Sequence, residues 1–491
     1  MKRGFVKRME LKLDQYKMYI DGQFVESSEG TLGDNINPST GEVLNQVPQA
    51  SLEDLDRALK AARRAQKSWK HVPSNERAEY LYQLSDLILE HKETFAKVIS
   101  TEVGKVLEQA MGEVEATAEY FKYYAGWARK YEGEIVPSDS PNENIMIFKK
   151  PVGVVAGILP WNYPFFLIAR KVAPAILTGN TVIVKPSSSA PNNALIFAQL
   201  LEAVDLPAGV VNILSGDREF GSALASSPDV DLVSITGSVR AGQAVMKAAS
   251  ENITNVNLEL GGKAPTVVWK DADLDVAVKA IVASRVINSG QVCNCTERVY
   301  VHEAIKDEFY DRITEAMSQV KYGNPLEDES VDMGPLITQS GLDSVEEKIS
   351  AATSAGARIL TGGQRGEGLG YFFEPTVIAD ATNDMTIMQQ EIFGPVLPIG
   401  TFKTLDEALE LANDSDYGLT SAIFAQDYNV ILKFINNMEA GEVYVNRHSF
   451  EAIQGFHAGW KKSGIGGADG RHGLEEFLAT TVAYIEYDNE V

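Results

Sequence analysis

Residues 151–189 read PVGVVAGILPWNYPFFLIARKVAPAILTGNTVIVKPSSS. Two short apolar runs, at 152–159 and 181–184, enclose a segment that is long enough for a helix. Similar runs continue along the chain about every 20–30 residues, at 210–214, 232–235 and 256–258. Strands that alternate with helices build a parallel sheet with crossover helices. The stretch therefore predicts a doubly wound α/β domain.

Toward the N-terminus, two local signals flank this domain. Residues 18–25 predict a hairpin, because Asp21-Gly22 is a favoured turn pair between strand-forming residues. A helix is predicted to begin at Ser51, where Asp54 completes a capping box. The doubly wound domain is thus expected to be preceded by a hairpin and by helices.

Toward the C-terminus, the alternation of strands and helices continues. A helix is predicted over about 273–287, and a second one, capped at Thr404, precedes a strand at 419–425. A second α/β unit is therefore expected over about 262–455. Residues 480–487 read as an exposed strand, which would need a pairing partner.

Composition excludes several classes of function. The chain has 491 residues with 44 basic and 68 acidic side chains, so its net charge of −24 would repel nucleic acid and anionic lipid. Its longest apolar run is shorter than the roughly 20 residues that span a bilayer, and its basic start lacks the apolar core of a secretory signal. The two cysteines, Cys293 and Cys295, cannot staple a chain this long, which indicates a reducing compartment. A cytoplasmic protein of two or three domains is expected.

Three polar residues could carry nucleophilic chemistry. Cys293 lies in a turn after a helical stretch, and a thiolate attacks carbonyls well, although many cysteines are merely small buried hydrophobes. Glu259 ends an apolar strand, where apolar neighbours would raise its pKa and suit it to general base work; the alternative is a solvated strand-end carboxylate. Asn162 could donate to an oxyanion, or it could make only local turn bonds.

Other residues at strand ends could approach a dinucleotide. Gly216 and Gly237 each begin a glycine pair, but neither pair forms a P-loop or a G-x-G-x-x-G motif. Ser238 follows a strand and precedes a helix, which favours phosphate approach. Lys185 closes another strand and places a cation where a ribose or phosphate could bind, although most such lysines are solvated. The six histidines form no metal-ligand pattern, so no metal site is expected.

Taken in order, these motifs resemble the aldehyde dehydrogenase superfamily. Within it the chain looks most like the bacterial lactaldehyde (glycolaldehyde) dehydrogenases, with an especially close match over residues 285–295 and 455–464. The resemblance covers nearly the whole chain. It implies a Rossmann-type cofactor domain, an α/β catalytic domain and a small β oligomerisation arm. The motifs are Pro160-Trp161-Asn162, Lys185-Pro186, Thr236-Gly237-Ser238, Glu259-Leu260-Gly261-Gly262, Gly290-Gln291-Val292-Cys293 and Glu391-Ile392-Phe393-Gly394-Pro395.

The resemblance also implies domain limits and partners. The dinucleotide-binding domain would comprise 9–131 and 151–261, and the catalytic domain 262–475. The segments 132–150 and 476–491 would cover sheet edges between subunits of a homo-oligomer, either a dimer or a tetramer. The cofactor would be NAD or NADP, and the substrate a small aldehyde.

A mechanism follows from the resemblance. Cys293 would attack the aldehyde, Asn162 and the Cys293 backbone N–H would hold the oxyanion of the thiohemiacetal, and hydride would pass to the nicotinamide. Glu259 would then activate water against the thioester. The residues that would bind the cofactor are Trp161, Lys185, Ser188, Gly216, Gly237, Ser238, Leu260, Glu391 and Phe393.

Two places depart from the commonest family pattern. Members that prefer NAD generally have Glu three residues after the lysine, where this chain has Ser188, so tolerance of NADP is expected. The expected substrate tunnel is unusually polar. We expect its side chains to hydrogen-bond a hydroxyl beside the carbonyl, as in lactaldehyde or glycolaldehyde. They are Arg170, Asn294, Glu451 and His457.

Three alternatives remain open at this point. The substrate could be another aldehyde, such as succinate semialdehyde or betaine aldehyde. The chain could be a non-catalytic binding protein on the same fold, because a fold fixes no activity. A thiol hydrolase is the third alternative, and the lack of a histidine near Cys293 in the sequence argues against it.

Overall fold

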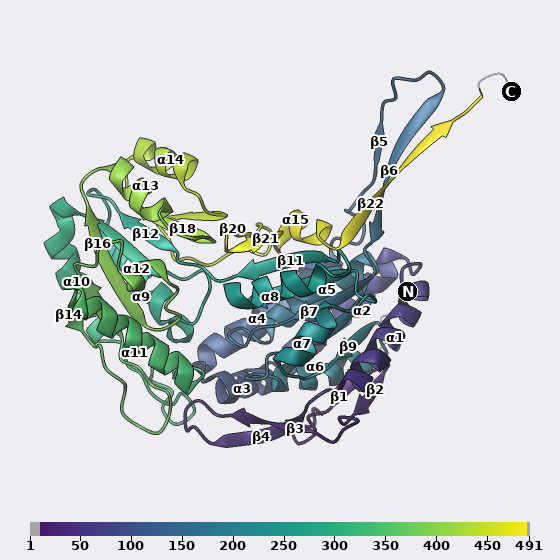
Figure 1. The fold of residues 1–491 in the computed structure, drawn as a ribbon, viewed down its shortest axis with the longest axis horizontal. Coiled ribbons are helices and arrows are strands. Elements are labelled where there is room, and N and C mark those ends of the chain that lie inside the picture. The colour runs from purple at the N-terminus through teal and green to yellow at the C-terminus, as the bar shows by residue number, and fades with distance from the viewer. Residues whose placement is uncertain (1–9, 489–491) are drawn as a thin grey trace.

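The computed structural model of the chain describes residues 10–488, which form two lobes and a projecting arm (Figure 1). The predicted domain start at residue 9 lies just outside this range. Each lobe is built on its own sheet, with helices on both faces. This arrangement confirms the predicted α/β class.

The first lobe contains an eight-stranded sheet in the order β2-β1-β9-β8-β7-β10-β11-β21. Its five central strands are parallel, as the alternation of apolar runs predicted. Antiparallel strands close both edges, the predicted hairpin at one and β21 at the other. The strands are β1 (Met18–Ile20), β2 (Gln23–Val25), β7 (Val154–Ile158), β8 (Thr181–Lys185), β9 (Val211–Ile213), β10 (Leu232–Gly237), β11 (Asn255–Leu260) and β21 (Gly464–Ile465).

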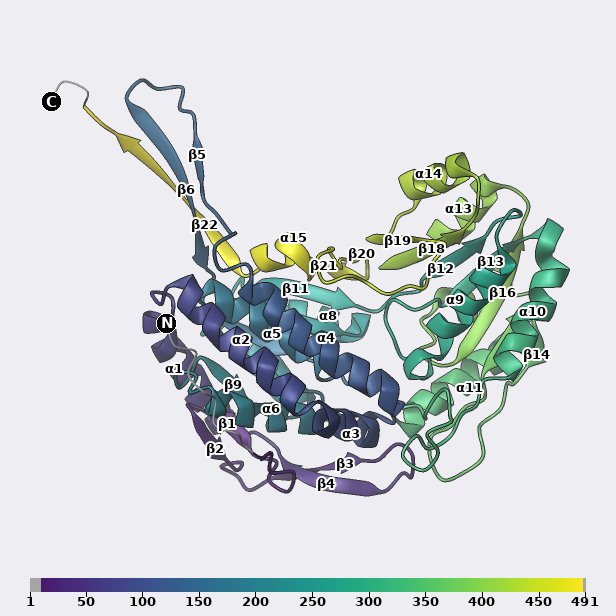
Figure 2. The same cartoon turned by 180° about the vertical axis from the view of Figure 1, so that it is seen from behind.

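Helices cover both faces of this sheet because its strands are apolar on both sides. Along β7, Val155 packs into one core cluster while Val154 and Ala156 pack into another. Figure 2 shows α2 and α4 across the first of these faces. That face carries α2 (Ser74–Glu90), α3 (Lys92–Val103), α4 (Leu107–Ala125), α5 (Phe166–Thr178) and α6 (Asn192–Ala203), and the other carries α1 (Leu52–Trp69), α7 (Arg218–Ala225) and α8 (Val239–Ala249). The predicted capping box of Ser51 and Asp54 begins α1.

The second lobe contains a seven-stranded sheet in the order β14-β15-β16-β13-β12-β18-β19, parallel except for β14. The helix predicted over 273–287 is α9, and the helix capped at Thr404 is α13. The strands are β12 (Pro265–Val268), β13 (Arg298–His302), β14 (Arg358–Thr361), β15 (Thr376–Ala379), β16 (Val396–Phe402), β18 (Thr420–Phe424) and β19 (Glu442–Val445). The helices are α9 (Leu274–Val286) and α10 (Lys306–Ser318) on one face, and α11 (Gln339–Ser354), α13 (Leu405–Asn413) and α14 (Tyr428–Asn437) on the other.

The chain returns to the first lobe after the second one is complete. Strand β21 pairs with β11, and α15 (Gly470–Glu475) contacts α5. The predicted catalytic domain of 262–475 therefore includes a final segment that packs on the first lobe.

The arm consists of β5 (Glu134–Val136), β6 (Glu143–Pro151) and β22 (Leu478–Glu486). The C-terminal strand, predicted to need a partner, pairs with β6 from Leu478↔Pro151 to Glu486↔Glu143. Both ribbon views show the arm standing away from the two lobes (Figures 1 and 2). It exposes the apolar side chains of Ile135, Phe148, Val482, Tyr484, Ile485 and Tyr487.

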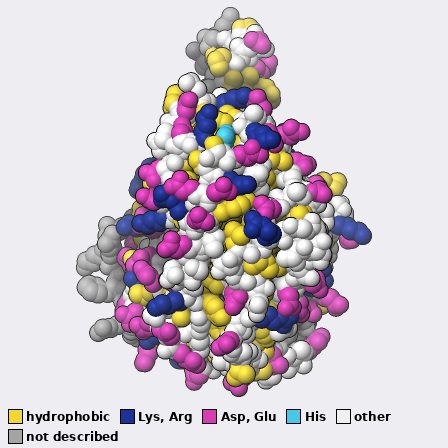
Figure 3. Space-filling view, turned by 90° about the vertical axis from the view of Figure 1, so that its left-hand side faces the viewer, with side chains coloured by type: hydrophobic (Ala, Val, Ile, Leu, Met, Phe, Trp, Pro, Cys, Tyr) yellow, Lys and Arg dark blue, Asp and Glu magenta, His cyan; other side chains and the backbone are white. Residues whose placement is uncertain are grey.

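The face of the second lobe in Figure 3 mixes acidic and basic side chains, with apolar ones between them. The acidic surplus is therefore not gathered there into one continuous patch. Within residues 10–488, no helix is long and apolar enough to span a bilayer.

Candidate active site

A cavity of about 530 Å³ is lined by residues of both lobes. Most of the predicted site residues meet in it. The first lobe contributes Trp161, Asn162, Arg170, Gly237, Ser238, Leu260 and Asp469, and the second contributes Cys293, Asn294, Glu391, Phe393 and Glu451. The cavity does not include Lys185, Ser188, Gly216, Glu259 and His457, which lie at the sheet edge or behind its wall.

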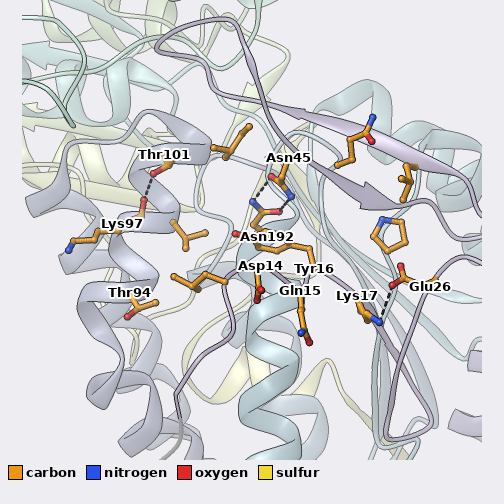
Figure 4. A pocket seen from close by; sticks show the side chains of 16 residues that line it. Asp14, Gln15, Tyr16, Lys17, Glu26, Asn45, Thr94, Lys97, Thr101 and Asn192 are labelled. Carbon is orange, nitrogen blue, oxygen red and sulfur yellow. Dashed lines mark hydrogen bonds and ion pairs between the residues drawn. The ribbon is translucent and has the colours of Figure 1, made fainter.

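A second cavity of about 740 Å³ lies between the N-terminal segment, α3 and the hairpin of β3 (Leu32–Ile36) and β4 (Val43–Pro48). Figure 4 shows the side chains of Asn45 and Asn192 bonded to each other in it. It contains none of the predicted site residues. The first cavity is therefore the candidate active site.

A tight loop presents Cys293 to the cavity. Asn288 and Ser289 adopt left-handed backbone conformations, with φ of 46° and 57°, directly after α9. Cys293 is half-buried and lines the cavity, whereas the thiol of Cys295 is buried and donates to the Val292 carbonyl at 2.9 Å. Burial raises the pKa of Cys295 to about 12, which keeps that thiol inert. The loop thus offers one of its two thiols for chemistry.

Asn162 is fixed by bonds to both its side chain and its backbone. Its side-chain Nδ2 donates to the Gln291 carbonyl at 3.0 Å. Its own backbone carbonyl accepts from Lys105 Nζ at 2.9 Å and from Asn288 Nδ2 at 3.1 Å. Because a carbonyl faces the amide, the nitrogen must point that way, and its second N–H remains free for another acceptor. The loop that carries Asn162 and the loop that carries Cys293 are therefore held together by hydrogen bonds.

A buried ion pair supports Asn162 from α4. Lys105 Nζ lies 2.5 Å from Glu113 Oε2, and both side chains are completely buried. Lys105 also lies over the Tyr163 ring, 3.5 Å from its centroid, and Glu113 accepts from the Phe165 N–H at 2.9 Å. Neither residue was predicted as part of the site, because no local pattern marks a lysine before a helix as the partner of a residue inside it.

Glu259 has a different environment from the one predicted. Its Oε1 accepts from Lys171 Nζ at 2.5 Å, and its Oε2 lies 3.4 Å from Arg170 Nη1 and 3.2 Å from Thr236 Oγ1. Burial raises the pKa of this carboxyl, as expected, but the charges of Lys171 and Arg170 outweigh burial and lower the pKa to about 2. The predicted raised pKa is therefore wrong for this conformation.

The polar tunnel residues Arg170, Asn294 and Glu451 hydrogen-bond one another, whereas the buried Arg170 Nε has no partner among the described residues. Arg170 Nη2 donates to Glu451 Oε1 at 3.1 Å and to Asp469 Oδ2 at 3.0 Å. Asn294 donates to the other oxygen of Glu451. Asp469, which was not predicted, has φ of 73° and accepts from the Tyr120 hydroxyl at 2.8 Å. An aspartate in a left-handed conformation after a glycine-rich stretch leaves no distinctive mark in the sequence.

His457 is buried outside the lining of the cavity. Its Nδ1 is 2.9 Å from Glu442 Oε2. Burial lowers the pKa of His457, but the Cys293 and Glu442 side chains and the charge of Glu451 outweigh burial and raise the pKa well above the ordinary value. The expected lack of a histidine near the nucleophile concerned only neighbours along the chain, and His457 is 164 positions after Cys293. His457 reaches Glu442 because the chain passes back along β19 (Glu442–Val445).

Most of the predicted cofactor residues lie at the carboxyl ends of the parallel strands of the first sheet. Five of them end or follow the parallel strands β7 to β11. Ser238 caps α8 by accepting from the Ala241 N–H, and Phe393, at φ of 55°, packs edge-on against Trp161. Glu391 accepts from the Gly262 N–H at 3.0 Å, and burial raises its pKa to about 7. The five strand-end residues are Trp161, Lys185, Gly216, Gly237 and Leu260.

Within residues 10–488, no group of three or more His, Cys, Asp or Glu side chains is arranged to hold a metal ion.

Comparison with known proteins agrees with this geometry. Residues 24–483 match the profile of the aldehyde dehydrogenase family. The lactaldehyde dehydrogenase of Escherichia coli is 53% identical, with 96% of this chain and 99% of that protein covered, and its crystal structure superposes with a TM-score of 0.95. A solved 3,6-anhydro-L-galactose dehydrogenase in complex with NADP is 43% identical over 96% of this chain and all of that one, with a TM-score of 0.94.

A more distant solved relative has the same architecture. The betaine aldehyde dehydrogenase of Staphylococcus aureus, in complex with NAD+, is 36% identical over 98% of this chain and 96% of that one, with a TM-score of 0.95. Profile and relatives cover nearly all of the chain, including every motif of the cavity. The chain therefore belongs to the aldehyde dehydrogenase family.

Proposed function

We propose that this aldehyde dehydrogenase oxidises a small 2-hydroxy aldehyde, such as lactaldehyde or glycolaldehyde, to its carboxylic acid with NAD or NADP. The observation that carries the substrate class is the polar wall beside Cys293. Asn294 and Glu451 line the cavity next to the nucleophile and are bonded to each other. The Asn294 amide nitrogen carries a second N–H, and the carboxylate oxygens of Glu451 can each accept a further hydrogen bond. These groups suit a hydroxyl adjacent to a carbonyl.

The charges around the cavity disfavour strongly charged aldehydes. Three carboxylates, those of Glu259, Glu451 and Asp469, surround Arg170. Lys171 adds a second cation and His457, whose pKa is raised well above its ordinary value by its neighbours, adds a third, so the charges compensate one another. A neutral, polar aldehyde would meet no unpaired charge here, whereas the carboxylate of succinate semialdehyde would meet carboxylates and the cation of betaine aldehyde would meet Arg170.

The residues present fit a nicotinamide dinucleotide. Lys185 is buried and has no carboxylate within ion-pair distance among the described residues, so its ammonium retains donors for ribose hydroxyls. Burial lowers its pKa to about 8. Glu391 would bind the second ribose, and the N-terminus of α8 at Ser238 would bind the pyrophosphate. When bound, the dinucleotide supplies the hydride acceptor.

The chain's own groups would perform the remaining steps. Cys293 Sγ attacks the aldehyde carbon, and the second N–H of Asn162 and the backbone N–H of Cys293 hold the resulting oxyanion. After hydride has left, a thioester remains on Cys293. Glu259, once released from Lys171, takes a proton from the water that hydrolyses this thioester.

We also propose that the enzyme is a cytoplasmic homo-oligomer, a dimer or a tetramer. A free nucleophilic thiol suits a reducing compartment. The apolar side chains of the arm face outward, and a second copy of the chain would remove them from water.

The test of the substrate class compares kcat/KM for L-lactaldehyde and propanal, with NAD and NADP in parallel. We expect lactaldehyde to be preferred about tenfold, which is about 1.4 kcal/mol. Replacing the amide by an apolar group in Asn294→Leu should remove most of that preference while propanal oxidation persists. Equal efficiencies for the two aldehydes in the wild type would contradict the substrate class and leave aldehyde oxidation in place.

A further inference from the structure

The carboxylate of Glu297, one residue before β13, joins three segments that are far apart in the sequence. Its side chain is only 1% exposed. Its Oε1 accepts from Arg285 Nη1 at 3.0 Å and from the Phe393 N–H at 3.1 Å. Its Oε2 accepts from Lys263 Nζ at 2.8 Å and from the Ile392 N–H at 2.8 Å. Each carboxylate oxygen therefore has two donors, and the group is fully engaged.

Arg285 connects this carboxylate to the nucleophile loop, residues 290–296, which presents the thiol to the cavity. Its Nη1 also donates to the Thr296 carbonyl at 2.7 Å, and its Nη2 donates to the Gly290 carbonyl at 2.5 Å. The two carbonyls stand at the two ends of the loop. One guanidinium thus closes the loop and ties it to the carboxylate.

The other side of the carboxylate holds the cofactor segment, residues 391–393. Phe393 lines the cavity and packs edge-on against Trp161. Its φ of 55° is a left-handed conformation that a bulky side chain rarely adopts without support. Its backbone N–H and that of Ile392 are the two that Glu297 accepts. The carboxylate therefore holds the strained backbone of this segment in place.

The nucleophile loop and the end of the cofactor segment are also in close contact. Gly290 has φ of 74°, and a side chain there would place its first carbon 2.3 Å from the Gly394 carbonyl oxygen. Only a glycine fits at that distance. Because nothing lies between the two backbones to absorb a shift, a displacement of one is passed on to the other.

Charge keeps the carboxylate in its accepting form. Burial raises the pKa of Glu297, but the charges of Lys263 and Arg285 outweigh burial and lower the pKa below its ordinary value. Lys263 lies on the crossing from β11 to β12 that connects the lobes, so the first lobe is tied to the same group. An ionised carboxylate accepts from all four donors, whereas a neutral amide of the same size would turn its own N–H toward two of them.

We propose that Glu297 is a positioning residue for hydride transfer. Together with Arg285 and Lys263, it fixes the cofactor segment relative to the nucleophile loop. The thiol places the reacting carbon, and the cofactor segment places the hydride acceptor, so the carboxylate between them sets the distance over which hydride moves. The proposal rests on the roles proposed above for the thiol and for the cofactor segment, and it is independent of which aldehyde is oxidised.

The test compares Glu297→Gln with the wild type in three measurements. With propanal and saturating NAD, the rate of the stopped-flow NADH burst should fall about tenfold to a hundredfold, since a misplacement of about 1 Å has a cost of that size. The Kd for NAD, measured by calorimetry without aldehyde, should rise about tenfold, the loss of roughly one hydrogen bond to a charged group. Alkylation of Cys293 by iodoacetamide without cofactor should proceed at the wild-type rate, because Arg285 still closes the loop.

The matched control is Asp54→Asn, the same change from carboxylate to amide at a completely buried side chain in the capping box of α1. It should lower the melting temperature and leave the burst, the Kd and the alkylation rate unchanged. If Glu297→Gln does not fold, Lys263→Met/Glu297→Gln, which removes one charge of each sign, decides alone.

A burst rate or a Kd that matches the wild type would overturn the proposal. An equal loss of burst and alkylation rates would also overturn it, because both would then report general disruption of the nucleophile loop, and so would the same losses in the control. A wrong substrate class would appear in the wild type, as equal efficiencies for lactaldehyde and propanal. A wrong role for Glu297 would appear only in the comparison of the variant with the wild type, so the two can fail separately.

Discussion

Lys171 Nζ lies 2.5 Å from Glu259 Oε1, and both side chains are almost completely buried. Lys171 is on α5 and Glu259 is on β11, so the pair joins a helix to the sheet beneath it. A buried carboxylate beside an ammonium stays ionised far below its ordinary range, because protonation would leave the ammonium unpaired. The carboxylate that should activate water is thus held in its basic form but engaged by a cation.

Replacing Lys171 should therefore move the acid limit of thioester hydrolysis. The pKa of Glu259 is lowered to about 2, so the base remains ionised throughout the working range. In Lys171→Met the burial of Glu259 is opposed only by the more weakly acting charges of Arg170 and His457, so its pKa rises and the base is protonated at a higher pH. Stopped-flow measurement of NADH formation should show a burst like that of the wild type. As the pH is lowered, the steady-state rate of the variant should begin to decline at a higher pH than the steady-state rate of the wild type. Lys67→Met, at an exposed lysine, is the control, and superimposable profiles would refute this role.

We propose that Ser188 sets the discrimination between NAD and NADP. It is exposed just beyond the end of β8, three residues after Lys185. A carboxylate at this place would repel the 2′-phosphate of NADP and accept a hydrogen bond from the 2′-hydroxyl of NAD. Ser188→Glu should lower kcat/KM for NADP by about tenfold or more, roughly 1.4 kcal/mol, and leave NAD nearly unchanged. Ser250→Glu adds the same charge at the far end of α8, and a similar loss there would show that the effect is nonspecific.

The Lys105–Glu113 pair should matter for both stability and catalysis. Its two charges are fully buried, so Lys105→Met strands the carboxylate of Glu113 and should destabilise the protein by about 3–5 kcal/mol. The double variant Lys105→Met/Glu113→Gln removes both charges and should recover most of the melting temperature. Its kcat should nevertheless remain low, because the Asn162 carbonyl has still lost a donor. Full recovery of kcat in the double variant would contradict the positioning of Asn162 by Lys105.

The features of this site that the sequence predicts are those set by residues close together along the chain. Contacts between residues far apart in the sequence were not predicted. The parallel strands of the first sheet were predicted from their apolar runs, and their ends bring Trp161, Lys185 and Ser238 to one edge as expected. The pKa of Glu259 could not be predicted, because Lys171 is 88 positions away and α5 reads as an apolar helix. A local strand pattern reports burial, but it says nothing of the charge that a neighbouring element brings.

The same limit explains the other omissions. His457 reaches Glu442 only after the chain has completed the second sheet, and β21 joins the first sheet from the far end of the sequence. Asp469 was missed although it bonds Arg170 and Tyr120, because its role depends on a left-handed backbone conformation. Pairings of this kind follow from topology, which short windows of sequence do not contain.

The arm carries the last prediction, which concerns assembly. Val482 and Tyr484 lie on the same face of β22, with 43% and 68% of their side chains exposed in the single chain. If a second copy covers this face, burying two unpaired ammonium groups there costs more than the lost apolar contact alone. Val482→Lys/Tyr484→Lys should therefore lower the molar mass measured by size exclusion with light scattering, while the circular dichroism spectrum is retained. Ile253→Lys changes an apolar side chain that is 91% exposed outside the arm and should leave the mass unchanged. A full-size assembly in the double variant would place the subunit contact elsewhere on the molecule.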